Sequence, residues 1–190
     1  MKVSKQQAAQ NRERVVETAA KLFREHGYNG IGVADLMKAA GMTHGGFYAK
    51  FGSKEALLAE AAAKAIEVSM EDWDRVVAKQ PGDPLRAVTE AYLSPLHRDQ
   101  IGRGCAIAAL GPELSRLSDE VRDAVTDGVS KQIDKLTPIM HQADPQAQRQ
   151  SALAAYAAMV GALVLARAVT DEKLSAEMMD AVLESINRAV

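Results

Sequence analysis

Residues 33–51 read V-A-D-L-M-K-A-A-G-M-T-H-G-G-F-Y-A-K-F. Apolar residues in the first half recur at helical spacing. Gly41 follows this stripe, and glycine commonly ends a helix because it adopts a left-handed conformation without steric cost. Thr43 is expected to cap a second helix, on which Phe47 and Phe51 share the buried face. Two helices joined by a glycine turn predict a helix-turn-helix, whose second helix lies in the major groove of DNA.

The charge of the chain divides at about the end of this motif. Residues 1–54 carry nine Lys and Arg against four Asp and Glu, whereas the remainder carries 14 against 21. A basic N-terminal quarter on an acidic body favours binding to an anionic polymer, although a short basic segment also arises by chance.

The rest of the chain predicts an all-α fold of about nine helices. The pattern indicates an N-terminal three-helix bundle that contains the helix-turn-helix, followed by a larger C-terminal helical bundle. A long helix at about residues 54–79 is expected to join the two. A short helix is expected at 105–110, and a last helix from Ser175 to Val190. We expect a DNA-binding domain at residues 11–71 and an effector-binding and dimerisation domain at residues 72–190.

Composition argues against several other classes of protein. Cys105 is the only cysteine, so no internal disulfide forms, and one Cys with four scattered His does not predict a metal site. The start of the chain lacks the apolar segment of a signal peptide. The longest apolar run, residues 151–166, is shorter than the roughly 18 residues expected of a membrane span. We therefore expect a cytoplasmic protein with no cofactor, no metal and no membrane partner.

Two stretches resemble the TetR/AcrR family of bacterial transcriptional regulators. They are R-E-R-V-V-E-T-A-A-K-L-F-R-E-H-G-Y at residues 12–28 and the opening motif with its continuation G-S-K-E-A-L to residue 57. The glycine after the first helix, the A-G-x-T turn, F-Y-x-x-F and S-K-E-x-L fall in register, over about residues 11–71. The resemblance implies a homodimeric repressor that binds a palindromic operator and releases it when a small molecule binds.

The resemblance also implies roles for individual residues. Thr43 matches the position that caps the recognition helix and touches a phosphate, and the three residues after it match positions that face base edges. Tyr48 and Lys54 match phosphate-binding positions. The candidate DNA-binding residues are Thr43, His44, Gly45, Gly46, Tyr48, Lys50 and Lys54.

This sequence departs from the family pattern at three glycines. Gly32 stands where many members have a Ser or Thr that caps the second helix against a phosphate. Gly45 and Gly46 leave few side chains on the reading face, so the backbone, His44, Lys50 and DNA shape are expected to carry more of the specificity.

The run at residues 151–166 is apolar nearly all round, so a helix there must be covered on more than one side. We expect a homodimer through the last two helices, because twofold dimers are the commonest oligomers; the central helix of a monomeric bundle is the alternative. The candidate interface residues are Ala154, Ala158, Gly161, Leu165, Val182 and Ile186.

A small apolar or aromatic effector is expected to bind between the helices of the body, as the family layout implies, although plain core packing would use the same residues. The candidate cavity residues are Met70, Trp73, Tyr92, His97, Arg103, Cys105, Tyr156 and Met159.

Cys105 supports two further hypotheses. It is either a sensor of thiol-reactive electrophiles or an inert core residue. With His97 it would form the nucleophile and base of an enzyme, but the sequence offers no third orienting group, so we do not expect an enzyme. A helical scaffold without a nucleic-acid partner leaves the basic N-terminus and the helix-turn-helix unexplained.

Overall fold

The computed structural model describes residues 4–188, which form ten α-helices, two short 3-10 helices and no strand. The all-α prediction is confirmed. The elements are α1 (Lys5–His26), α2 (Val33–Ala39), α3 (Phe47–Phe51), α4 (Lys54–Lys79), α5 (Pro84–Tyr92), α6 (Pro95–Asp99), η1 (Ile101–Arg103), α7 (Ala106–Leu114), α8 (Asp119–Leu136), η2 (Thr137–Ile139), α9 (Pro145–Ala168) and α10 (Glu172–Arg188). The predicted end of the last helix at Val190 lies outside the described residues.

Side-chain caps explain where half of the helices begin. The side chains of Ser4, Ser53, Asp83, Ser94 and Asp144 each accept a hydrogen bond from the backbone N–H three residues on. Each satisfies a donor that has no partner within its helix. The last three of these helices also begin with proline, whose missing N–H costs nothing at that position.

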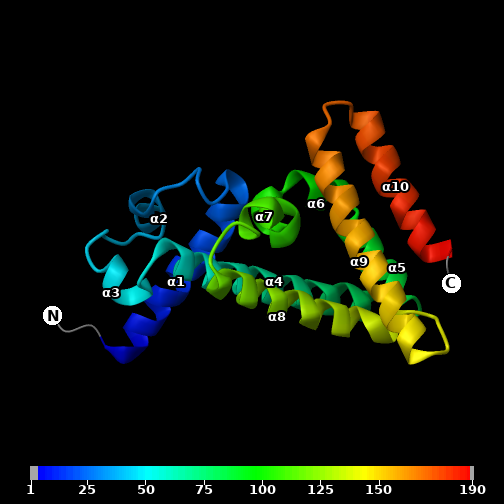
Figure 1. The fold of residues 1–190 in the computed structure, drawn as a ribbon, viewed down its shortest axis with the longest axis horizontal. Coiled ribbons are helices and arrows are strands. Elements are labelled where there is room, and N and C mark those ends of the chain that lie inside the picture. Colours follow the sequence, from blue (N-terminus) through cyan, green and yellow to red (C-terminus); the bar gives the residue numbers. More distant parts are fainter. Residues whose placement is uncertain (1–3, 189–190) are drawn as a thin grey trace.

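The molecule is elongated, with a small head at one end and a larger body at the other (Figure 1). The head consists of α1, α2, α3 and the start of α4. The helices α4 and α8 lie side by side along the long axis and join the two ends, and α9 and α10 form an antiparallel pair at the far end. We expected α4 to link the two bundles on the basis of its length, and it does so.

Helix α7 lies between the head and the body and contributes to both cores. Its Ala106 and Leu110 pack with Phe23, Phe47 and the other buried residues of the head. Cys105, its N-cap residue, and Ala108 pack with the body core around Met159 and Leu163. A change in the position of α7 would therefore alter the packing of both the head core and the body core.

The sequence underestimated the length of α7. A helix was expected at residues 105–110, because Gly111-Pro112 is a common end signal. The helix continues through Pro112 to Leu114. The missing N–H of Pro112 affects only the last turn, and the packing of Leu114 in the head core outweighs this loss.

By length and composition, one helix within residues 4–188, α9, is apolar enough to cross a membrane. In its most apolar 18-residue window, 39% of the residues are buried against the rest of the chain. A helix that packs in the core or in a subunit interface of a soluble protein has the same composition.

Candidate nucleic-acid interface and effector cavity

The turn between α2 and α3 differs from the prediction at one residue. Thr43 does not cap α3: the helix begins after Gly46, which is left-handed with φ +105°. Residues 43–45 are therefore part of the turn, and the recognition helix has only the five residues Phe47–Phe51. Two consecutive glycines have poor helix propensity, and the left-handed Gly46 is incompatible with a continuous helix.

This short helix is held by its buried face. The rings of Phe47 and Phe51 are 5.5 Å apart, and both are almost fully buried. The guanidinium of Arg12 lies 4.5 Å from the centroid of the Phe51 ring, and it donates to the carbonyl of Lys50 and to the Glu60 carboxylate. Arg12 therefore ties α1 to the C-terminal end of α3 and to α4.

The structure exposes six of the seven candidate DNA-binding residues on the turn and on α3. Tyr48 is the most prominent of the large apolar side chains there, with 61% of its surface exposed, and its ring lies edge-on to that of His44. Thr43, Lys50 and the two glycines are exposed beside them. These residues form a continuous surface that is free to meet a ligand.

Lys54 has a different environment. Its ammonium donates to the Tyr28 carbonyl at 2.5 Å and lies 4.4 Å from the centroid of the Tyr28 ring. Partial burial lowers the pKa of Lys54, and Glu113 acts in the opposite direction. An ammonium has three N–H donors, so two remain for a second partner.

The body contains a cavity of about 360 Å³ between the second half of α4, α5, α6, η1 and the start of α7. It brings together five of the eight predicted cavity residues, namely Trp73, Tyr92, His97, Arg103 and Cys105. Tyr156 and Met159 lie in the body core with Trp73, Tyr92 and Cys105 but do not line the cavity. Met70 lies instead in a groove between α4 and α8.

His97 is fixed by two backbone groups. Its Nε2 accepts a hydrogen bond from the Cys105 N–H at 2.8 Å, so Nδ1 carries the proton and donates to the Tyr92 carbonyl at 2.6 Å. Burial lowers the pKa of His97, the hydrogen bond to Tyr92 opposes this shift, and the guanidinium groups of Arg167 and Arg24 add to it. The imidazole is therefore neutral at physiological pH, and both ring nitrogens are occupied.

Cys105 is buried at the N-terminus of α7, where its Sγ accepts from the Ala108 N–H at 3.5 Å. Burial raises the pKa of both Tyr92 and Tyr156, and the neighbouring Cys105 thiol adds to each shift. His97 contacts the backbone of Cys105 rather than its sulfur. The pair therefore lacks the hydrogen bond by which a base activates a nucleophile.

Three hydrogen bonds connect the cavity wall and the adjoining segment to the head. The Arg24 guanidinium donates twice to the Gly102 carbonyl, at 3.1 and 2.5 Å. The Tyr28 N–H donates to Glu113 at 2.7 Å. A Cβ at Gly102 would lie 2.4 Å from the Glu25 carboxylate, so a larger residue there would require the Glu25 side chain to move. These contacts were missed from sequence; the glycines around Arg103 were the only signal of a close approach.

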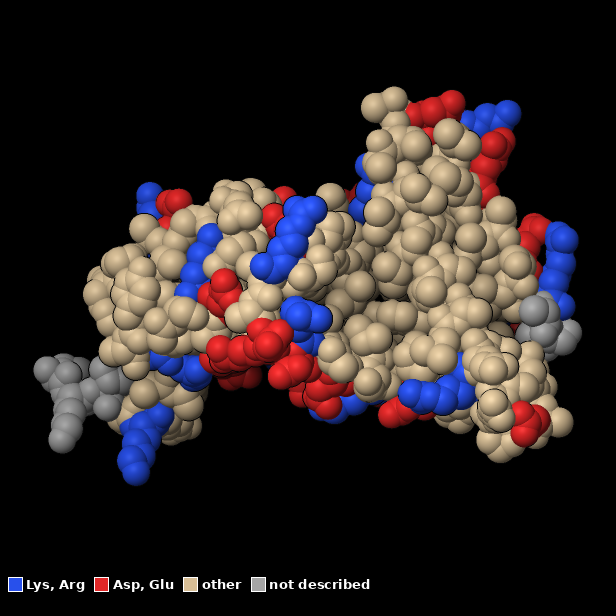
Figure 2. All heavy atoms as spheres, viewed as in Figure 1, with Lys and Arg blue, Asp and Glu red and all other residues tan. Residues whose placement is uncertain are grey.

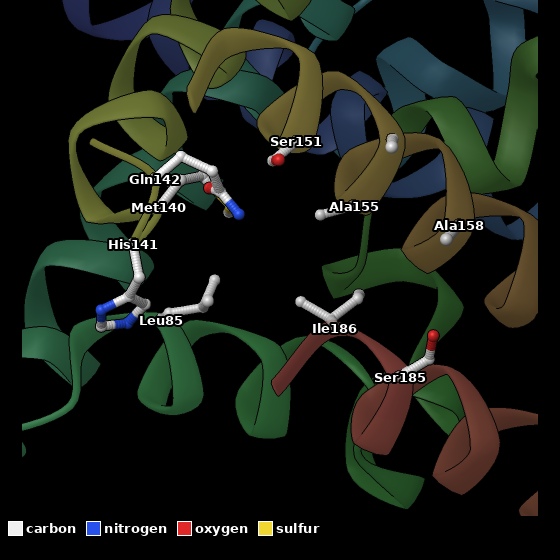
Figure 3. Close-up of a pocket in the computed structure, with 10 residues that line it drawn as sticks. Leu85, Met140, His141, Gln142, Ser151, Ala155, Ala158, Ser185 and Ile186 are labelled. Atoms are coloured by element: carbon white, nitrogen blue, oxygen red, sulfur yellow. The ribbon is translucent and has the colours of Figure 1, made fainter. Parts of the chain in front are cut away.

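A second cavity, of about 210 Å³, lies at the far end of the body (Figure 3). Leu85 of α5, Ala155 of α9 and Ile186 of α10 face it, and Gln142 reaches it from the segment between η2 and α9. Its lining includes no residue of the head, of η1 or of α7.

One face of α9 is apolar and exposed. Leu153, Val164 and Leu165 are 47%, 38% and 54% exposed, and a Cβ at Gly161 would meet nothing within 4 Å. Figure 2 shows this face as a broad uncharged column with charged residues only at its margins. Of the predicted interface residues, Ala154 and Leu165 are exposed, and Ala158, Gly161, Val182 and Ile186 are half-buried.

Comparisons with known proteins agree with this architecture. The profile of "Bacterial regulatory proteins, tetR family" matches residues 15–61, and that of "Tetracyclin repressor-like, C-terminal domain" matches residues 81–182. The HTH-type transcriptional repressor DhaR of Mycobacterium sp. (strain GP1) is 33% identical over 115 residues, which are 58% of this chain and 56% of DhaR. This chain thus spans just over half the length of that curated relative.

Solved structures share the fold over almost the whole chain. A TetR transcriptional regulator from Chloroflexus aurantiacus has a TM-score of 0.76 at 25% identity, covering 95% of this chain and 94% of its own. The reduced form of Escherichia coli NemR has a TM-score of 0.77 at 24% identity, covering 94% of this chain and 96% of its own.

Proposed function

The chain belongs to the TetR family of bacterial regulatory proteins, and we propose that it is a homodimeric repressor that leaves its operator when a small molecule binds in the body. It is a transcriptional regulator with a DNA-binding domain, and the regulators of its family are not enzymes. The observation that carries the proposal is the exposed surface from Thr43 to Lys50 on a firmly anchored recognition helix.

In this proposal the recognition helix enters the major groove. Tyr48 and Thr43 contact phosphates, and His44 with the bare backbone of Gly45 and Gly46 faces the base edges. A five-residue helix offers few side chains for direct reading, so the deformability of the operator contributes to specificity. Lys54 adds a phosphate contact with the donors that Tyr28 leaves free.

Dimerisation is proposed through α9 and α10. The exposed apolar face of α9 supports this, because monomers rarely expose a large contiguous apolar patch. A twofold dimer places two recognition helices in successive major grooves, roughly 34–36 Å apart, so the operator is an imperfect palindrome.

The effector is proposed to bind in the cavity between α4 and α7 rather than in the second cavity. A ligand shifts an equilibrium only by preferring one of the two states. The first cavity shares its wall with η1 and the N-terminus of α7, which contact the head through Arg24 and Glu113. A ligand there is well placed to change the position of the head.

The DNA-binding proposal is tested by fluorescence anisotropy with the chain's own upstream DNA over a series of salt concentrations. The proposal expects a steep loss of affinity with salt. Lys54→Ala should weaken binding on all sequences and reduce the salt slope, whereas His44→Ala should change the preference at particular base pairs. The control is Lys173→Ala, which removes an exposed cation on α10, and it should do neither. Absence of binding at every salt concentration would refute the proposal.

A thiol-sensing regulator is the second candidate, because Cys105 lines the same cavity and is close enough to Arg24 and Arg167 for electrostatic interaction. The test treats the operator complex with N-ethylmaleimide. Release that persists in Cys105→Ala would exclude this candidate.

A further inference from the structure

The rim of the larger cavity has an excess of positive charge. Four charged residues line it, and two of these, Asp72 and Arg75, form an ion pair with each other. Within residues 4–188, Lys79 and Arg103 make neither an ion pair nor a side-chain hydrogen bond. Both are exposed at the mouth of the cavity. Two cations therefore face the opening without a carboxylate partner.

The charge behind the cavity has the same sign. Arg24 donates to the Gly102 carbonyl, and Arg167 donates to the carbonyls of His97 and Arg98; in the described part of the chain neither forms an ion pair. The nearby carboxylates are paired with other cations, Glu25 with Lys21 and Asp99 with Arg98. Glu25 and Asp99 also attract Arg24 and Arg167, but two carboxylates against four cations leave this region with a net positive charge.

The cavity has an apolar patch beside polar lining residues such as Ser69, Ser94 and Gln100. Trp73, Val76 and Tyr92 form this patch, and Leu96, 66% exposed, lies at the rim. The Tyr92 hydroxyl is buried and has no hydrogen-bond partner among the described residues. This hydroxyl is enclosed beside the Cys105 thiol and is not open to the cavity. His97 is not available to a ligand either, since both its ring nitrogens are already bonded.

The volume limits the size of the ligand. An apolar cavity of about 150 Å³ is large enough for benzene. At about 360 Å³, this cavity has room for one or two rings or for a medium-length alkyl chain.

We propose that this cavity binds an amphipathic organic anion, an aromatic or medium-chain carboxylate. Its apolar part lies against Trp73 and Tyr92, and its carboxylate lies between Lys79 and Arg103. This inference rests on the proposed function only where it calls the bound acid the effector. Binding of the acid to the cavity can be tested independently of DNA release. It narrows the expected small apolar or aromatic effector to an anion.

The test compares acids with their amides, which match them in shape but carry no charge. Octanoate and cinnamate are titrated against octanamide and cinnamamide by calorimetry. Quenching of Trp73, the only tryptophan in the chain, locates the octanoate and octanamide in the cavity. Each acid should bind roughly two- to thirtyfold more tightly than its amide, as expected for two exposed ion pairs of ordinary strength.

Variants connect this preference to the rim. The double variant Lys79→Gln, Arg103→Gln should remove the preference for the acid and leave the affinity for the amide unchanged. The charge-matched control Lys131→Gln, Lys173→Gln removes two exposed cations elsewhere and should keep the preference.

Several outcomes would overturn the inference. They are equal affinity for acid and amide, a preference that survives in Lys79→Gln, Arg103→Gln, binding without a response of Trp73, and absence of binding by every probe. The proposed function has a separate readout. If an acid binds as described but leaves the operator complex intact, the carboxylate site stands and its role as effector site fails.

Discussion

His97 illustrates how a single residue acquires its role from its neighbours. A histidine between Leu96 and Arg98 is compatible with ligand binding, catalysis or plain structure. In the folded chain its two nitrogens join the Cys105 N–H to the Tyr92 carbonyl, so it links α7 to the end of α5. The bond from the Cys105 N–H requires the neutral ring, because a protonated imidazole has no acceptor, whereas the bond to the Tyr92 carbonyl forms in either state.

We therefore predict that the body loses stability in mild acid through His97. The unfolded side chain titrates near pH 6.5, and the folded pKa is lower, so below pH 6.5 the unfolded chain binds more protons. Stability is complete above pH 6.5 and falls below it, by at most about 1.4 kcal/mol per pH unit. His97→Gln should flatten this slope in urea titrations between pH 5 and 7. An unchanged slope would show that His97 is not the responsible group.

At the scale of the element, α3 depends on contacts from outside itself. A helix of five residues has no intrinsic stability in water. Phe47 and Phe51 anchor it in the head core, and Arg12 fixes its C-terminal end through a hydrogen bond to the Lys50 carbonyl. Gly46 sets its beginning by adopting a left-handed conformation. The recognition element is therefore defined by the head as a whole.

Alanine substitutions at Gly46 and Gly45 test whether α3 begins after Gly46. Gly46→Ala forces a side chain into φ +105° and should cost roughly 1–2 kcal/mol. Operator affinity should fall as well, because α3 is no longer presented in one orientation. Gly45 has no positive φ, and a Cβ there meets nothing within 4 Å, so Gly45→Ala should leave the urea midpoint almost unchanged. Equal destabilisation by both variants would contradict the position of the helix start.

At the scale of the whole molecule, the head and the body share α7, and the exposed face of α9 lies at the far end (Figure 1). In the proposed dimer this face is covered and the two heads are set at a defined separation. The larger cavity lies between this face and the head, against η1, which contacts α1. In this proposal, ligand binding and head spacing are coupled through the shared helix α7 and through the hydrogen bonds of Arg24 and Glu113.

Leu165→Glu tests the proposed dimer. A glutamate there would be buried without a partner, which costs about 3 kcal/mol or more and weakens the dimer at least about hundredfold. Light scattering should then find monomers at micromolar concentration, and operator affinity should fall. Val68→Glu, at an exposed apolar residue of α4, is the control and should remain dimeric. A dimer that persists in Leu165→Glu would place the interface elsewhere.

Arg24→Met tests the coupling of cavity and head. The variant keeps an apolar stem but loses both hydrogen bonds to Gly102. We expect a ligand that quenches Trp73 to bind as before, and DNA to bind as before, while the ligand no longer releases the DNA. Release at the original ligand concentration would show that the signal travels by another route, such as Glu113 and Tyr28.

Local signals were sufficient for much of this description. The helical periodicity and most caps predicted the all-α fold and nearly every helix, because these depend on residues within a few positions of one another. The register of the motif around residues 33–51 identified the family. The start of α3 was misplaced because Thr43 satisfies the local rule for a cap, whereas the conformation of Gly46 prevails.

The contacts between segments far apart in sequence were decided by the tertiary structure alone. Arg12 meets Lys50, Arg24 meets Gly102 and Tyr28 meets Glu113 because α1 packs against α3, η1 and α7. The same packing gathers five of the predicted residues into one cavity and excludes Met70. The sequence by itself determined which helices form and which surface is available to DNA, since both follow from local pattern. The cavity, its charge and its link to the head depend on how the helices pack, for which no short-range signal exists.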